Sequence, residues 1–524
     1  MTRNQRQIIR RIIVRGLLVL ESPTCFSNGD TDSNTDIALV KDSVSQRALL
    51  TGASIAGALR NYLHEYESGY GSNEKKSALA TSLFGAIRQD DDGDQSPLIV
   101  YDAPSTKPPI VELRDGVKIN SATRTAEEQA KYDLELLAAG TQFPLQFELV
   151  IDTSIVKTQA AVERLVKALA IALHGLENGD ISLGMKKRRG FGRCKVEQWQ
   201  VQDFDLTNIQ QLRDWLSHEH WTPGFLGIPP QTQTSIKNAL NIDWAGISDN
   251  RERLTIEATF ELSSPILIRA GELEAKVAPD TVHLKSYRHG EPVPIISGSS
   301  LAGVLRHRAE RIVNTIGNTI EKPPALINQI FGFVDEQETQ ANSSGTSENK
   351  ASASRLIVHE CEIKMPTDSE KKAKPTELVQ TRIAIDRFTG GAYSGALFQE
   401  QPIFHSGNPQ ATIELELRNP KHHEIGLLLL LIKDLWTEDL PVGGTSSIGR
   451  GRLKGKNAKV CWQNSEPKGW EIEQRSQNLK VKNLFNPEEA EETVRKSLED
   501  YVQALNNYSK PEANIDVKED RDSE

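Results

Sequence analysis

The chain has 524 residues, of which 26% are charged, and its formal net charge is −10 at pH 7. No apolar run is long enough to span a bilayer, and the basic N-terminal residues lead into an alternating strand pattern instead of a signal peptide. We therefore expect a cytoplasmic protein with no membrane partner. The four cysteines are far apart and lack CxxC or Cys/His spacing, which argues against disulfides and structural zinc.

The negative charge is unevenly distributed. Residues 486–524 contain 12 acidic and 5 basic residues, so this segment alone carries a charge of −7. By contrast, Met185–Lys195 contains six basic residues and no acidic one. A polyanion responds to the local field of such a patch more than to the charge of the whole chain. The sequence therefore predicts a basic binding surface on a globally acidic protein.

In chain order, the first half opens with an apolar strand of period two at Ile12–Pro23, followed by a polar loop. A helix is expected to begin near Ser54, because Ser is a favourable N-cap. A later strand at Gln146–Ile151 and a helix at Ala160–Leu176 precede a glycine-rich loop at Gly184–Gly192.

The second half predicts the same elements in the same order. They are a strand at Leu254–Pro265, a helix beginning near Ser300, a strand at Thr412–Leu417, a helix at Ile425–Leu435 and a glycine-rich loop at Gly444–Gly451.

The two halves are copies of one another. Thr51–Arg60, TGASIAGALR, recurs 246 residues later as SGSSLAGVLR at Ser297–Arg306, and a Phe-Gly pair follows each copy at 84–85 and 331–332. Copies of this size are domains that can each bury a core. The order strand-helix-strand-strand-helix-strand is typical of a ferredoxin-like or RRM-like sheet. We therefore expect an α+β protein of two tandem ferredoxin-like domains with inserted loops and hairpins.

The expected domain boundaries follow from these landmarks. The first domain covers residues 1–203 and the second covers 251–475. Residues 204–250 form an interdomain segment with an amphipathic helix around Leu212–Leu216. Residues 476–524 are expected to form a charged helix and an acidic, disordered tail.

The ordered motifs resemble the repeat-associated mysterious proteins (RAMPs) of CRISPR systems. The resemblance rests on the apolar strand, a loop with an Asp, the G-x-S-[IL]-x-G-x-[IL]-R helix, the Phe-Gly pair and the closing glycine-rich loop. It covers residues 8–201 and 253–460. More narrowly, the chain is similar to the backbone subunit of type III effector complexes, as a tandem fusion like those of type III-D. Arg382–Ala392 is another mark of that subunit, with a degraded counterpart at Val117–Ala126.

The resemblance implies a function and a set of partners. A subunit of this kind binds the guide RNA (crRNA), cuts the complementary target RNA once per copy, and assembles with the other subunits of the type III effector complex. A hairpin at Val117–Ala126 or Arg382–Ala392 is expected to push between bases near the cut. Only 6% of the residues are aromatic, which favours recognition of backbone and shape over base stacking.

The physical character of the motifs agrees with RNA binding. A Gly-x-Ser turn at the start of a helix presents backbone N–H groups and the positive end of the helix dipole, which suits a phosphate. The alternative is that the glycines serve tight turns and packing while the arginines pair with acids. The expected RNA-binding residues are Ser54, Arg60, Lys186, Lys187, Arg188, Arg189, Gly190, Gly192, Ser300, Arg306, Arg382, Gly449, Arg450 and Gly451.

The resemblance also points to the catalytic residues. The family's aspartate precedes a second polar residue by six positions, which makes Asp36 the match in the first half and Asp280 the match in the second. Asp30 and Asp32 remain competitors in the first loop. Nearby His283 is a possible assistant of Asp280, although its alternating position suits a strand residue.

The chemistry of these aspartates is constrained by their acidity. RNA is cleaved when its own 2′-hydroxyl attacks the adjacent phosphorus in line, and a loop Asp with a pKa of about 4 is a weak base for that step. We therefore expect Asp36 and Asp280 to orient the RNA or to hold a divalent cation, Mg²⁺ or Mn²⁺, together with it. No phosphate-binding loop motif is present, so no nucleotide cofactor is expected.

Two alternatives remain open at this point. One is a scaffold of the same fold that binds guide RNA without cutting. The other is a guide-processing endoribonuclease, a class that often uses a His in its first domain. No His precedes His64 in this chain.

Overall fold

Strand β1 (Ile8–Leu20) is the centre of the first sheet, whose order is β3 (Leu98–Val100), β7 (Gln142–Asp152), β1, β8 (Cys194–Asp205) and β9 (Thr232–Gln233). This computed structural model describes residues 7–27, 36–76, 78–86, 94–120, 123, 125–153, 158–217, 232–270, 279–317, 325–334, 351–366, 379–404 and 408–509. Asp30, Asp32 and the end of the acidic tail lie outside these residues. β1 pairs antiparallel with both β7 and β8.

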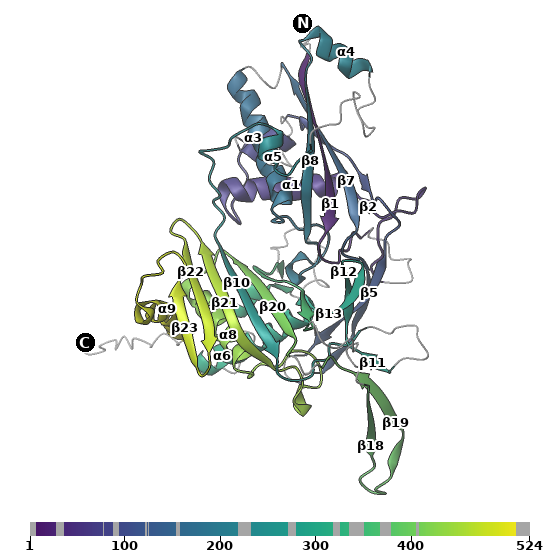
Figure 1. Ribbon diagram of the computed structural model, residues 1–524, viewed down its shortest axis with the longest axis vertical. Coiled ribbons are helices and arrows are strands. Elements are labelled where there is room, and N and C mark those ends of the chain that lie inside the picture. Colours follow the sequence, from purple (N-terminus) through teal and green to yellow (C-terminus); the bar gives the residue numbers. More distant parts are fainter. Residues whose placement is uncertain are drawn as a thin grey trace, which may run out of the picture.

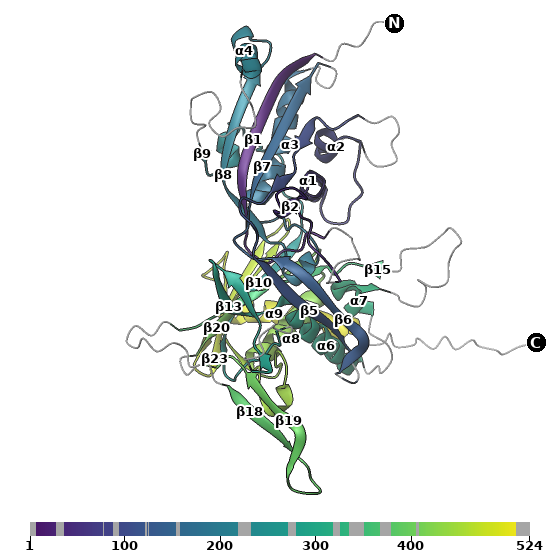
Figure 2. The same cartoon turned by 90° about the vertical axis from the view of Figure 1, so that its right-hand side faces the viewer.

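Helices α1 (Gly52–Ser68), α2 (Leu79–Phe84) and α3 (Gln159–Glu177) pack on one face of this sheet (Figures 1 and 2). The alternation of β1 explains the packing, because Ile12, Val14, Leu18 and Leu20 are all buried in the core that these helices share. The order β8-β1-β7-β3, with α1 and α3 as the two crossovers, is that of a ferredoxin-like sheet.

The second domain repeats this plan with additions at both edges of its sheet. Its central strands are β17 (Cys361–Lys364), β20 (Gln410–Arg418), β10 (Arg253–Leu262) and β21 (Leu453–Gln463), with β16 (Leu356–Val358) also paired to β20. β12 (Lys285–Arg288) and β13 (Glu291–Ile296) extend one edge, and β22 (Lys468–Arg475) and β23 (Asn478–Asn483) extend the other. The predicted class, two tandem ferredoxin-like α+β domains, is confirmed.

The helices of the second domain are α6 (Gly298–Gly317), α7 (Ala325–Phe331), α8 (His422–Trp436) and α9 (Glu491–Ser509). α9 packs closely on α8, since a Cβ atom at Gly426 would lie 2.2 Å from the carbonyl oxygen of Tyr501. The expected boundary at residue 475 falls between the paired strands β22 and β23.

Both Gly-x-Ser helices begin two residues before the expected serines, at Gly52 and Gly298. Thr51 is the N-cap of α1, and its Oγ1 accepts the N–H of Ser54 at 3.4 Å. The expected cap at Ser54 was therefore wrong. In α6 the Oγ of Ser297 accepts the N–H of Ser300 at 3.3 Å, so the same shift holds in both copies.

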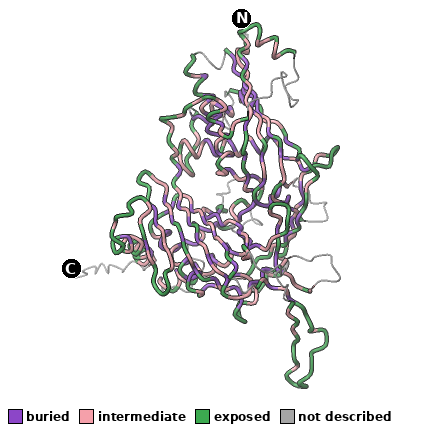
Figure 3. Tube along the Cα trace, viewed as in Figure 1, coloured by how far each residue is buried: buried purple, intermediate pink, exposed green. Residues whose placement is uncertain are grey.

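Each domain carries an inserted hairpin. In the first domain it is formed by β5 (Val111–Ile119) and β6 (Ala126–Leu137), and in the second by β18 (Gln380–Ile385) and β19 (Ala392–Gln401). The β18–β19 hairpin projects from the molecule and its residues are mostly exposed (Figures 1 and 3).

The β5–β6 hairpin instead docks on the second domain. Buried Arg114 forms ion pairs of 3.0 Å with Glu112 on its own strand and with Glu360 of the second domain. Glu112 also accepts hydrogen bonds from the hydroxyl of Ser286 and the N–H of Tyr287. A buried ion pair is stable only when its remaining polar atoms are satisfied, as they are for these carboxylates.

The short elements complete the domains. The interdomain segment forms α4 (Ile209–Ser217), which includes the expected helix, and α5 (Ile236–Ala239). The remaining short strands are β2 (Leu49–Leu50), β4 (Ala103–Pro104), β11 (Thr281–Val282), β14 (Phe333–Val334) and β15 (Ala351–Ser352). Among the described helices, none has both the length and the apolar character required to cross a membrane.

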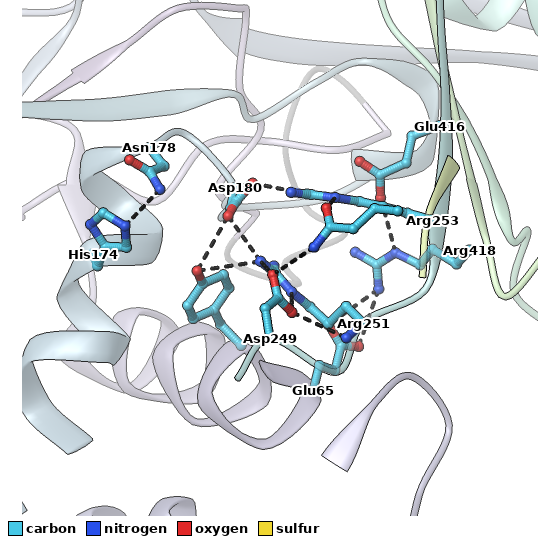
Figure 4. A network of polar contacts seen from close by, with 11 residues as sticks. Glu65, His174, Asn178, Asp180, Asp249, Arg251, Arg253, Glu416 and Arg418 are labelled. Carbon is cyan, nitrogen blue, oxygen red and sulfur yellow. Dashed lines mark hydrogen bonds and ion pairs between the residues drawn. The ribbon is translucent and has the colours of Figure 1, made fainter. Parts of the chain in front are cut away.

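A polar network fixes the two domains to one another (Figure 4). Asp180 of the first domain accepts from Arg251 and Arg253, each at 3.0 Å. Burial opposes the ionisation of Asp180, but the two arginines outweigh it and hold its pKa below the usual value. Arg418 of β20 pairs with Glu65 of α1 at 3.1 Å.

Candidate nucleic-acid interface

A groove of about 2110 Å³ lies between the two domains. One wall is formed by the first domain, from the exposed N-terminal turns of α1 with Ser54 and Gly57 to the glycine-rich loop. The other wall is the face of the second sheet that its helices leave open, with Glu257, Glu414 and Lys459 among its residues. The tip of the β5–β6 hairpin also borders the groove.

The glycine-rich loops of the two domains have the same backbone. Gly184, Lys186, Gly190 and Gly192 have positive φ, and a 3₁₀ turn spans Lys187–Arg189. The second loop has positive φ at the corresponding residues Gly443, Thr445, Gly449 and Gly451, and its 3₁₀ turn spans Ser446–Ile448.

Equivalent hydrogen bonds show which residues of the two loops correspond. Leu183 N–H donates to the carbonyl of Gly192 at 2.8 Å, and Val442 N–H donates to that of Gly451 at 2.9 Å. The repeated loop therefore begins at Gly443, one residue before the expected Gly444. The loops differ in side chains, because four consecutive basic residues of the first are replaced by Thr-Ser-Ser-Ile in the second.

The basic side chains of the first loop are crowded and lack acidic partners. In the described part of the chain, no carboxylate lies within ion-pair distance of Lys187, Arg188 or Arg189. Burial, and then a neighbouring arginine in each case, lowers the pKa of all three groups. The fourth residue, Lys186, lies over the ring of Tyr132 at 3.5 Å from its centroid. Uncompensated cations at the edge of a groove favour a bound anion.

The second loop has no comparable charge on the groove. Arg450 is only 3% exposed and pairs with Glu400 at 3.0 Å, and its other terminal nitrogen donates to Gln380. Arg382 also pairs with Glu400 at 3.0 Å. Arg450 thus fastens the β18–β19 hairpin to its domain, whereas Arg382 joins the two strands of the hairpin to one another.

Arg60 and Arg306 join the Gly-x-Ser helix to the Phe-Gly turn that follows it. Arg60 pairs with Glu74 and donates to the carbonyl of Gly85 at 3.2 Å. Arg306 donates to the carbonyl of Gly332 at 2.9 Å in the same way. This contact explains why the two motifs occur together in both halves. Arg306 also lines the groove.

The glycines of the Gly-x-Ser helices divide into two kinds. A Cβ atom at Gly52 would lie 2.3 Å from the carbonyl oxygen of Val100, and one at Gly298 would lie 2.3 Å from that of Arg189. These two glycines therefore permit close packing within the protein. Gly57 and Gly303 have no atom within 4 Å of the corresponding position, and Gly57 borders the groove.

The expected catalytic aspartates occupy equivalent positions in the two domains. Asp36 Oδ2 accepts the backbone N–H of Asp133 on β6 at 2.8 Å, and Asp280 Oδ2 accepts that of Gln399 on β19 at 2.7 Å. In each case the next residue pairs in parallel with the hairpin strand, Ile37 with Leu134 and β11 with β19. Both side chains are exposed beside an inserted hairpin.

The surroundings of the two aspartates differ. Asp133 pairs across the hairpin with Asp115, and burial together with this neighbouring carboxylate raises the pKa of Asp133. The corresponding cross-strand pair in the second domain is Thr381 with Gln399, which carries no charge. The site around Asp36 therefore holds more carboxylates than the site around Asp280.

His283 has a structural role in this arrangement. Its Nδ1 accepts the N–H of Ile268 at 3.1 Å and its Nε2 donates to the carbonyl of Ile295 at 2.9 Å. Burial lowers its pKa to about 4, so the ring is neutral at physiological pH. Both ring nitrogens are occupied, and the side chain is buried.

The described residues contain no group of three His, Cys, Asp or Glu side chains arranged to hold a metal ion. A cation at Asp36 or Asp280 therefore needs further ligands from outside the described residues. Each aspartate uses Oδ2 for the hairpin N–H, and Oδ1 has no hydrogen-bond partner in the described part of the chain. One oxygen is thus left for a cation or for RNA.

Several groove residues were not expected from the sequence. They lie in or next to strands and helices of both domains: Arg193, Arg251, His307, His359, Arg418 and Lys459. Their positions depend on how the second sheet faces the first domain, and no local motif signals that arrangement. Only Arg193 lies within the basic segment that the sequence singled out.

A family model described as the RAMP superfamily matches residues 17–195 and 259–454. The two matched regions lie within the two ferredoxin-like domains, one in each, and include both glycine-rich loops. A search among curated proteins gave no significant match.

Proposed function

Because this chain belongs to the RAMP superfamily, whose members include CRISPR-associated RNA-binding subunits, we propose that it is the double backbone subunit of a type III effector complex. In this proposal the chain acts in the cytoplasm, holds the guide RNA in the interdomain groove, and cleaves the complementary target RNA once per domain. The tandem form is like that of the type III-D branch. The other effector subunits and the target RNA are its partners.

The observation that carries RNA binding is the uncompensated charge of the first glycine-rich loop. Lys187 is exposed and Arg188 and Arg189 are half-buried beside a groove, and no carboxylate of the described residues lies within ion-pair distance of them. Glu65 and Glu416 act on Lys187 and Arg188 only at longer range, because both glutamates pair with Arg418. Phosphates of an RNA strand supply the missing negative charge. Exposed Gly57 on the same wall leaves space for a sugar-phosphate chain.

The support for cleavage is the equivalence of Asp36 and Asp280. Each carboxylate is held by one hairpin N–H, which fixes its direction while one oxygen stays open. Such a group can orient the 2′-hydroxyl of a splayed nucleotide for attack in line with the leaving 5′-oxygen. A divalent cation bound there with the RNA would stabilise the charge that develops on the phosphate.

The test uses the assembled complex with guide and end-labelled complementary RNA. We expect Asp36→Asn and Asp280→Asn each to reduce one specific cut by about 100-fold or more, with target binding retained. Asn keeps an oxygen that accepts the hairpin N–H, so the loop keeps its shape. Asp205→Asn is the matched control and should leave all cuts unchanged, since Asp205 is exposed at the end of β8, where it accepts the N–H of Thr207.

The outcome distinguishes the three candidate functions. An unchanged set of cuts in both variants would make the chain a scaffold that binds guide RNA without cutting. Discrete products from precursor RNA incubated with the chain alone would instead indicate a guide-processing endoribonuclease.

A further inference from the structure

His359 lies at the junction of the two domains, at the end of β16. Along this strand Leu356 and Val358 face the core, whereas Ile357 and His359 line the groove. The first glycine-rich loop packs directly on the His359 backbone. A Cβ atom at Gly190 would lie 3.0 Å from the Cα of His359 and 2.4 Å from the N of Glu360.

The imidazole ring is incompletely satisfied. Its Nδ1 is buried and has no hydrogen-bond partner among the described residues. A buried polar atom without a partner is destabilising, and such atoms in native proteins often mark a function. With Nδ1 enclosed, Nε2 is the ring nitrogen left for a ligand in the groove.

The charged groups around the ring come from both domains. Arg193, which immediately precedes β8, and Glu414 and Glu416 of β20 face it, and Arg193 pairs with Glu414 at 2.7 Å. Burial and then Arg193 lower the pKa of His359, against the opposite effect of the two glutamates. The ring is therefore neutral in the free protein at pH 7.

We propose that His359 is an RNA contact of the groove that binds in its protonated form, so that RNA binding is accompanied by uptake of a proton. The proposal rests on the proposed function, because it needs an RNA strand in this groove. Phosphates held by Arg188 and Arg189 would bring negative charge to the ring and favour the imidazolium form. RNA affinity then increases as the pH falls.

The sign of the effect follows from linkage. A group whose pKa is higher in the complex than in the free protein strengthens binding fully below its free pKa. This contribution is lost as the pH rises through the pKa of the complex. For an upward shift of about one unit from a free pKa below the usual value, we expect the Kd to increase roughly three- to sixfold between pH 6 and pH 8.

The experiment measures binding of a fluorescein-labelled single-stranded RNA to the full chain by anisotropy, from pH 6 to pH 8 at constant ionic strength. We expect His359→Gln to abolish the pH dependence. His307→Gln is the matched control, since His307 is the other histidine among the groove residues that the structure describes, and it should keep the dependence of the unsubstituted protein.

A second measurement requires no substitution and therefore does not depend on the fold of a variant. Calorimetric titration of the unsubstituted protein with the same RNA at pH 7, in two buffers of different ionisation enthalpy, gives the number of protons taken up. We expect a net uptake of a substantial fraction of one proton. RNA binding with no proton uptake would overturn the proposal.

The outcomes separate this proposal from the function on which it rests. RNA binding that is weakened by Lys187→Ser with Arg188→Ser but is independent of pH would refute the role of His359 and leave the groove assignment intact. The same holds if His359→Gln keeps the pH dependence. Failure of the unsubstituted protein to bind RNA would refute both.

Discussion

Arg450 occupies in the second glycine-rich loop the place that Phe191 occupies in the first. Both lie between two glycines of positive φ, and both are buried, with 3% and 5% of their surfaces exposed. Phe191 packs in the hydrophobic core, whereas Arg450 ties the β18–β19 hairpin through Glu400. The same backbone therefore accommodates an apolar side chain in one loop and a charged one in the other. Side chains at equivalent positions of the two loops can thus be exchanged.

The first prediction uses this exchange. Lys187→Ser with Arg188→Ser gives the first loop the side chains that the second carries in the same 3₁₀ turn, so the fold should be unchanged. We expect weaker RNA binding and a salt dependence whose slope, in log Kd against log salt, falls by about 0.7 for each phosphate that the variant no longer binds. Anisotropy at several salt concentrations measures both quantities. The reciprocal changes Ser446→Lys and Ser447→Arg, away from the groove, should not restore affinity.

The second prediction concerns the open glycine of α1. Gly57→Ala adds a methyl group that meets no protein atom within 4 Å, and Ala stabilises a helix interior by about 1 kcal/mol relative to Gly. We expect higher stability together with weaker RNA binding, because the methyl group enters the groove. Gly303→Ala, at the equivalent position of α6, should stabilise without affecting RNA. Thermal unfolding measures the stability of the two variants, and anisotropy measures their RNA affinity. Equal RNA affinity in the two variants would contradict the proposal that RNA lies in the groove.

The third prediction isolates the contact between the domains. Gly190 and Gly449 have nearly the same φ, +85° and +87°, so replacement by Ala strains both backbones alike. Only at Gly190 does the added Cβ atom collide with the neighbouring domain, at Glu360. We expect Gly190→Ala to destabilise the protein by roughly 1–3 kcal/mol more than Gly449→Ala. Urea unfolding of the two variants gives the difference, and equal values would mean that the loop does not support the interface.

The fourth prediction concerns pH. The folded state holds His283 neutral with a pKa of about 4, whereas the unfolded chain binds a proton near pH 6.5. The unfolded state therefore takes up more protons between these values, and stability falls as the pH drops from 6.5 to 4. The loss should reach about 3 kcal/mol.

Urea unfolding as a function of pH measures this effect. His283→Gln should remove that component of the slope even if it lowers stability overall. His289→Asn is the control, since His289 is exposed in a turn with φ of +52° that Asn tolerates. A slope in His283→Gln equal to that of the unsubstituted protein would contradict the assignment.

The repeated landmarks made the fold predictable. Thr51–Arg60 and Ser297–Arg306 are local patterns, and their strands and helices follow from local periodicity. The partners of the charged side chains are not local. Arg60, Arg306 and Arg450 look like ligands for phosphate in the sequence, yet Glu74, Gly332 and Glu400 satisfy them in the fold.

The groove was unpredictable for the same reason. It forms where the open face of the second sheet meets the first domain, and its lining includes His359, just after β16, and Lys459 of β21, which belong to no motif of their own. By contrast, the basic surface at Met185–Lys195 could be predicted from the sequence, because its charge is concentrated in one short segment. Local charge density was thus informative where isolated arginines were not.

The two inserted hairpins differ in their contacts, so one can serve as a reference for amide hydrogen exchange in the other. The β5–β6 hairpin rests on a neighbouring domain through Arg114, while the β18–β19 hairpin extends freely with Phe388 97% exposed at its tip. Amide hydrogen exchange should therefore be slow in the first hairpin and fast in the second within one sample. If exchange in β18–β19 slows under other conditions, the hairpin has come into contact with a neighbouring molecule. The exchange rate of β5–β6 in the same chain then serves as the reference for a docked hairpin.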